Sequence, residues 1–181
     1  MTKEKLKPLL PYVGIPIIGA VFFLLCGKQA DVFIIFLCEL VIVFGYIAAV
    51  LDIKTKKIPN GFILAMFAAW VLTMMPKLLL DTDMAIDMLK DAALGFVIGG
   101  GLFLLVYLIS RKGLGGGDVK FMAAAGLYIG FTGILSAMLY GTILAALVGL
   151  VLLLLKKIGR KDAMPLAPFL YIGILITVFY R

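Results

Sequence analysis

The sequence predicts an all-α fold: a polytopic membrane bundle of about seven transmembrane helices with a cytoplasmic N-terminus. Hydrophobic residues make up 64% of the 181-residue chain, whereas soluble domains contain about 45–50%. Long uncharged stretches recur, each able as a helix to cross a hydrocarbon core of about 30 Å. Basic residues gather in alternate connections between these stretches, as cytoplasmic loops do.

Six stretches carry few or no charges, namely 8–27, 32–51, 58–76, 92–110, 121–155 and 163–180. Only Glu39 interrupts the second of them. Five of the stretches have the length of one span each. A single helix over 121–155 would be about 52 Å long, too long for one crossing, and Gly130 and Gly133 lie inside it. We therefore expect two spans there, which makes seven.

Charges in the connections give the direction of the spans. Basic residues occur at the N-terminus and after the second, fourth and sixth spans, as Lys3, Lys5, Lys7, Lys54, Lys56, Lys57, Arg111, Lys112, Lys156, Lys157, Arg160 and Lys161. The connection 77–91 is predicted to be a loop with solvated acidic residues, Asp81, Asp83, Asp87 and Asp91. This alternation places the N-terminus inside and the C-terminus outside. The first span is followed by no A-x-A site, so we expect it to stay uncleaved, and we expect one domain over 1–181.

The charge and the missing residue types exclude several classes of function. The net charge of +7 fits cytoplasmic loops better than nucleic-acid binding. The chain has no histidine, which excludes histidine-based triads and histidine-ligated metals. Cys26 and Cys38 form no C-x-x-C pair, so neither a metal module nor a disulfide framework is expected.

Three acidic residues lie within or at the ends of the predicted spans: Glu39, Asp52 and Asp118. Asp52 closes the second span and Asp118 opens the fifth, so both lie at the cytoplasmic boundary and meet if those spans pack together. Two neighbouring carboxyl groups hold one proton between them. Such a pair can hydrolyse a peptide bond, since one partner takes a proton from water and the other protonates the carbonyl oxygen. The alternative is two unrelated helix-end residues, because an acid at a helix N-terminus suits the helix dipole.

The residues around the two aspartates favour the pair. Four glycines lie within 113–117, directly before Asp118. They let the backbone approach other helices closely and bend at the entry of the span, including through positive φ. The alternative is a flexible loop, and no phosphate-binding glycine motif is present. Pro59 suits the first turn of the third span.

The spacing D-x5-I-P-N from Asp52, together with G-x-G-D-x-K around Asp118, resembles the type IV prepilin peptidase family of GxGD-type membrane aspartic proteases. The segment 164–173 is similar to a third, looser motif of that family. The resemblance covers about 45–175. It implies that Asp52 and Asp118 are catalytic, and that Gly115, Gly117, Lys120 and Pro59 support the motifs.

The resemblance also implies an activity. The chain is expected to be an aspartic endopeptidase of the cytoplasmic (inner) membrane, which cleaves the basic leader of prepilin or pseudopilin-like precursors after a glycine at the cytoplasmic face. It would serve type IV pilus assembly or protein secretion, with no cofactor, metal or nucleic acid, and with the precursor and the lipid bilayer as partners. Neither the identity of the precursor nor the oligomeric state follows from the sequence. Family members that also N-methylate carry paired C-x-x-C motifs between the first two spans. Only 27–31 lies there, so we expect peptidase activity alone.

Two other functions stay open. A small proton-coupled transporter would use Asp52, Asp118 and Glu39, and it predicts acidic residues near the bilayer midplane and an internal repeat. A non-enzymatic assembly protein of a pilus or secretion machine is the third alternative. Glu39 lies about 20 Å from Asp52 along one helix, so we expect it to stay outside the pair. We expect it to form a buried hydrogen bond between helices, the alternative being a proton path.

Overall fold

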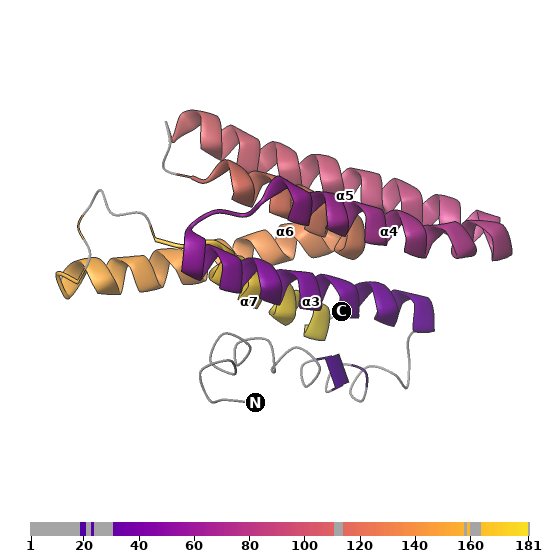
Figure 1. Ribbon diagram of the computed structural model, residues 1–181, viewed down its shortest axis with the longest axis horizontal. Coiled ribbons are helices and arrows are strands. Elements are labelled where there is room, and N and C mark those ends of the chain that lie inside the picture. The colour runs from indigo at the N-terminus through magenta and orange to yellow at the C-terminus, as the bar shows by residue number, and fades with distance from the viewer. Residues whose placement is uncertain are drawn as a thin grey trace, which may run out of the picture.

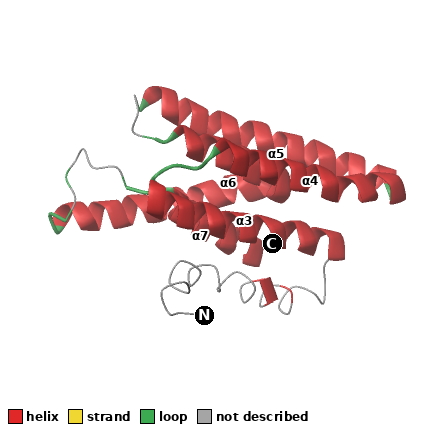
Figure 2. Ribbon diagram, viewed as in Figure 1, coloured by secondary structure: helices red, strands yellow, loops and turns green. Residues whose placement is uncertain are grey.

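The computed structural model describes residues 19, 20, 23, 31–110, 114–157, 159 and 164–180. Within this part of the chain it contains five helices and no strand (Figures 1 and 2). They are α3 (Val32–Thr55), α4 (Asn60–Leu80), α5 (Thr82–Ile109), α6 (Gly116–Leu154) and α7 (Ala167–Tyr180). The first four are long and apolar enough to cross a membrane. The all-α class and the multi-pass membrane character are therefore confirmed.

The predicted count of seven spans is not what the described residues show, since they form five helices. The first predicted span, 8–27, lies outside the described residues except for 19, 20 and 23. The last predicted span is shorter than expected: α7 has 14 residues, or about 21 Å. Pro165 and Pro168 explain its late start, because proline is accepted in the first turn of a helix and not further inside.

A chain reversal divides α6 into two halves. Gly130 has φ 68° and ψ −172°, a conformation that glycine adopts without strain. An ideal Cβ on Gly99 of α5 would lie 2.6 Å from the Met122 carbonyl oxygen and 2.8 Å from Ile134 Cγ1. In an unbroken helix those two residues would be about 18 Å apart, so the halves must lie side by side. Figure 1 shows both ends of α6 at one end of the bundle, and the predicted break is confirmed at Gly130.

The connection 77–91 is helical, so the predicted loop is wrong. α4 continues to Leu80, α5 begins at Thr82, and Asp81 alone separates them. The Asp81 side chain accepts a hydrogen bond from the Met84 N–H at 3.3 Å, and Asp83 lies in the first turn of α5. Acidic side chains at a helix N-terminus are favourable. The run of aspartates therefore starts a helix.

Asp91 is not the solvated loop residue that was predicted. It lies on α5, half-buried, and its Oδ1 accepts a hydrogen bond from the Phe131 N–H at 3.0 Å. A Cβ added to Gly130 would meet the same carboxylate. Because the first N–H groups of a helix lack partners within it, Asp91 acts as a cap for the second half of α6, supplied by a neighbouring helix.

The two ends of the described bundle differ in charge, as the alternation of connections predicts. Basic residues at the α3–α4 connection and after α6 lie at the end shown on the left of Figure 1, namely Lys54, Lys56, Lys57, Lys156 and Lys157. At the other end Lys77 of α4 pairs with Asp31 at 3.2 Å. The Phe33 N–H and the Lys77 ammonium hold the pKa of Asp31 below its usual value.

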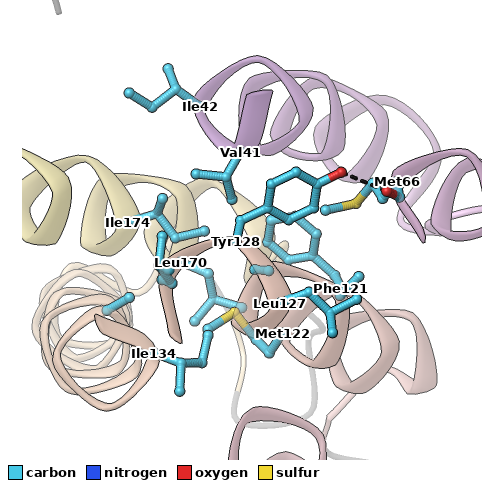
Figure 3. Close-up of a cluster of buried hydrophobic side chains, with 14 of the residues drawn as sticks. Val41, Ile42, Met66, Phe121, Met122, Leu127, Tyr128, Ile134, Leu170 and Ile174 are labelled. Atoms are coloured by element: carbon cyan, nitrogen blue, oxygen red, sulfur yellow. Dashed lines mark hydrogen bonds between the residues drawn. The ribbon is translucent and has the colours of Figure 1, made fainter. Parts of the chain in front are cut away.

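The first half of α6 forms the centre of the core. Every residue from 121 to 130 is buried, which fits a run that is apolar on all faces. Figure 3 shows Val41 and Ile42 of α3, Met66 of α4 and Leu170 and Ile174 of α7 around this segment. The Tyr128 hydroxyl donates a hydrogen bond to the Met66 carbonyl oxygen. The start of α6 is thereby held firmly in the middle of the bundle.

Candidate active site

Asp52 lies in the last turn of α3 and faces the interior, with 7% of its surface exposed. The helix ends at Thr55 because Lys56 adopts the left-handed conformation, with φ 51°, and its N–H bonds to the Asp52 carbonyl oxygen at 2.8 Å. Pro59 then precedes α4 as its extended N-cap residue, one position earlier than the predicted first turn. This short connection keeps Asp52 at the basic end of the bundle.

Asp118 lies in the first turn of α6 and is 8% exposed. Gly115 is extended, with φ −77° and ψ 136°, and its carbonyl oxygen accepts from the Asp118 N–H at 3.1 Å. The predicted bend at the helix entry is present. It does not use positive φ, since Gly130 is the one glycine with positive φ among the described residues.

Gly117 allows a close approach between α6 and the α3–α4 connection. An ideal Cβ on Gly117 would lie 3.1 Å from Ile58 Cβ and 3.3 Å from the Ile58 nitrogen. Because the Ile58 atoms belong to backbone or to a branched Cβ, they have little freedom to move. Glycine at this position therefore lets the turn that carries Asp118 lie against the connection that follows Asp52.

Asp52 and Asp118 line the same cavity, which has a volume of about 520 Å³. The other lining residues come from the α3–α4 connection and from the start of α6: Lys56, Lys57, Ile58, Pro59, Asn60, Gly115, Gly116 and Gly117. The two carboxyl groups interact electrostatically. The structure thus brings the two predicted site residues together, at the ends of two helices and beside a cavity large enough for water.

Lys120 and Asn60 connect the two segments of the site. The Lys120 ammonium donates a hydrogen bond to Asn60 Oδ1 at 2.8 Å. Lys120 follows Asp118 by two positions on α6, and Asn60 begins α4 directly after the connection from Asp52. This contact gives a structural reason for both polar residues. Sequence reasoning singled out Lys120 without finding its partner.

The start of α7 forms a third side of the site. The Ala167 N–H donates a hydrogen bond to Asp52 Oδ2 at 3.0 Å, and Ala167 is fully buried. Sequence reasoning matched the segment 164–173 to a motif but assigned Ala167 no contact. The prolines of this segment were the available signal for such a contact. Pro168 fixes the first turn of a helix, and the N–H groups of that turn need acceptors.

Glu39 lies half-buried on α3, about 20 Å along the helix from Asp52. It does not line the cavity that holds Asp52 and Asp118. The expectation that Glu39 stays outside the pair is confirmed.

Comparison with known proteins finds a matching family and several relatives. Residues 39–152 match the type IV leader peptidase family, a range that includes Asp52 and Asp118 but not α7. The chain is similar to a prepilin leader peptidase/N-methyltransferase of Bacillus subtilis, with 31% identity over 74% of this chain and 51% of the relative. A protein of the same name from Xanthomonas campestris is 28% identical over 85% of this chain and 51% of the relative.

A shorter relative is the leader peptidase HopD of Escherichia coli, which is 37% identical over 46% of this chain and 58% of the relative. The chain spans about half the length of the first two relatives. No solved structure matches the chain.

Proposed function

The chain belongs to the type IV leader peptidase family, and from this membership we propose that it is a membrane-embedded aspartic endopeptidase with Asp52 and Asp118 as its catalytic pair. One observation carries the proposal: two buried carboxyl groups from different helices line one cavity at the basic end of the bundle. Gly117 allows the close approach of the two segments, Lys120 bonds across them, and the cavity is also lined by Gly115 and Pro59.

The pair supplies acid–base catalysis without a metal or a cofactor. The ionised aspartate takes a proton from a water molecule, whose oxygen forms a bond to the peptide carbonyl carbon. The protonated aspartate gives its proton to the carbonyl oxygen, which yields a neutral tetrahedral intermediate. When the C–N bond breaks, the proton taken from water passes to the leaving nitrogen, and the carbonyl re-forms as its hydroxyl proton returns to the second aspartate.

The substrates we propose are prepilin or pseudopilin-like precursors, the class named for the relatives. Their basic leader would stay in the cytoplasm and be cut after a glycine. The lysines at the α3–α4 connection and after α6 support a cytoplasmic position for this end, because positive residues stay inside. If 8–27 forms the first span, this orientation gives seven spans and a cytoplasmic N-terminus. We place the protein in the inner membrane.

The transporter alternative has less support. It requires acidic groups near the bilayer midplane, whereas Asp52 and Asp118 lie at helix ends. A non-enzymatic assembly protein has no use for two buried carboxyl groups beside a cavity of this size, since burying charge without function is costly.

We propose peptidase activity alone, without N-methylation, because the connection at 27–31 leaves no room for paired C-x-x-C motifs between the first two predicted spans. The new N-terminus should be an unmodified amine when S-adenosylmethionine is present. A product heavier by one methyl group would contradict this part of the proposal.

Co-expression with a prepilin in bacteria that lack their own leader peptidase tests the proposal. Cells with the wild-type chain should accumulate the shortened pilin, and cells with Asp52→Asn or Asp118→Asn should keep the precursor. Equal amounts of each membrane protein on a blot provide the control. Uncut precursor in cells with the wild-type chain, tried with both pilin and pseudopilin precursors, would overturn it.

A further inference from the structure

The start of α7 donates a hydrogen bond to Asp52, one of the two carboxyl groups of the site. The Ala167 N–H donates to Asp52 Oδ2 at 3.0 Å from a fully buried position. On Asp118, Oδ1 is buried and has no hydrogen-bond partner among the described residues, while Oδ2 lies beside Gly115. Both carboxyl groups lie at the start of a helix, Asp52 beside α7 and Asp118 on α6. They differ in that Asp118 has a buried oxygen without a partner among the described residues.

This difference bears on which carboxyl group holds a proton shared by the pair. A backbone N–H stabilises the ionised carboxylate that accepts from it, whereas a carboxyl oxygen buried without a donor is costly to ionise. A protonated carboxyl group instead needs an acceptor for its O–H. In the complex, the carbonyl oxygen of a peptide bound in the cavity would be that acceptor for Asp118.

We propose that the Ala167 amide is a positioning group that keeps Asp52 as the ionised base and leaves Asp118 as the acid that carries the proton. The inference rests on the proposed peptidase function and assigns the two roles within it. It also gives the motif at 164–173 a purpose: Pro168 fixes the first turn of α7, so that the Ala167 N–H points out of the helix toward Asp52.

Three lysines lie near the two carboxyl groups. Lys56 and Lys57 line the cavity that both carboxyl groups share, and Lys120 of α6 bonds to Asn60. The described residues of α7 and of the segment before it, 164–180, include no charged side chain. The Ala167 amide donates directly to a carboxyl oxygen of Asp52.

Replacing the Ala167 amide by an ester tests the proposal, because lactic acid inserted at position 167 removes the N–H and keeps the side chain. The acidic limb of the pH dependence of kcat/KM should move to higher pH by about one unit, as expected for loss of a hydrogen bond to a charged group. The matched control is an ester at position 169, since the Phe169 N–H makes an ordinary helix bond to the Leu166 carbonyl oxygen at 3.0 Å. It should leave the limb in place.

A second measurement needs no substrate. In protein with 13C-labelled aspartate carboxyl carbons, the Asp52 signal is identified by its loss in Asp52→Asn, and its titration should also move to higher pH in the 167 ester. An Asp52 titration that is the same in parent and 167 ester would overturn the inference, as would an equal shift in the 169 ester. Failure of the wild-type chain to cut any precursor would instead contradict the proposed function, and the titration would still decide the role of Ala167.

Discussion

Two aspartates at opposite ends of the bundle make the same contact, and only one of them lies in a site suited to chemistry. Asp52 accepts from the Ala167 N–H and Asp91 from the Phe131 N–H, each at 3.0 Å and each at the start of a helical segment on another part of the chain. The Asp52 end also has a second buried acid and a cavity of about 520 Å³. The cavity beside Asp91 is about 70 Å³ and is lined mostly by apolar residues.

The Asp91 end shows what a capping carboxylate does for the fold, and the Asp52 end has features beyond capping. A carboxylate that caps a helix satisfies backbone N–H groups and stabilises the fold, and Asp91 needs no further explanation. At the other end, Asp118 adds a second carboxyl group, whose Oδ1 is buried without a hydrogen-bond partner among the described residues. A capping role does not account for such an oxygen. Substitutions at the two ends should therefore affect different properties of the protein.

The largest difference is expected from the carboxyl groups themselves. Asp52→Asn or Asp118→Asn should lower the cleavage rate by at least about a hundredfold, because each removes a proton-transfer group. Asp91→Asn should leave cleavage nearly unchanged, since the amide oxygen still accepts from Phe131. Glu39→Gln should also retain activity. Rates on a fluorescent leader peptide check all four variants, and near-normal turnover in either of the first two would break the comparison.

The next effect concerns the close approach at the catalytic end. Gly117→Val should cut the rate by about a hundredfold without removing a catalytic atom, because a displacement near 1 Å at a reacting group costs that much. The matched control is Gly101→Val on α5, outside the cavity, where an added Cβ has no described atom within 4 Å. If both valine variants cleave equally well, the contact with Ile58 does not hold Asp118 in place.

A smaller loss should follow from breaking the bond between Lys120 and Asn60. Lys120→Met removes a donor to the α3–α4 connection and should lower kcat by about fivefold, the value of one solvent-accessible hydrogen bond. Lys90→Met is the control, because Lys90 pairs with Asp87 at 2.9 Å at the other end of the bundle. A loss of the same size in both variants would point to a general effect of charge.

The smallest expected effect on activity lies at the Asp91 end, where stability should change instead. Asp91→Ala leaves the Phe131 N–H without its cap and should lower the free energy of unfolding by about 1 kcal/mol. Thermal unfolding in detergent measures this loss, and the remaining folded protein should cleave at the parent rate. A fall in kcat at full folding would mean that the two ends are coupled.

The parts of the site that the sequence predicts are those with a side-chain signature. Ionised groups are rare in a chain this apolar, so charge singled out Glu39, Asp52 and Asp118 as candidates, and the surrounding motifs favoured the two aspartates. Gly130 and Gly133 marked the break in the long run. The helical start at 82–91 could not be predicted in the same way, because aspartates favour both loops and the first turn of a helix.

The Ala167 contact was hidden for a different reason. It is made by a backbone N–H, which every residue but proline has, so no residue type marks it. Only the packing of α7 against α3 selects this amide as the partner of Asp52. Sequence patterns show which groups are able to do chemistry, while the tertiary fold decides which of them is held in which protonation state.

The central claim is that Asp52 and Asp118 act as one catalytic pair, and mass spectrometry of a purified reaction tests it most directly. The purified protein is incubated in detergent with a prepilin, in parallel with Asp52→Asn and Asp118→Asn. We predict two fragments, divided after the leader glycine, from the wild-type protein and intact precursor from both variants. Intact precursor with the wild-type protein, or the same two fragments with either variant, would contradict the account.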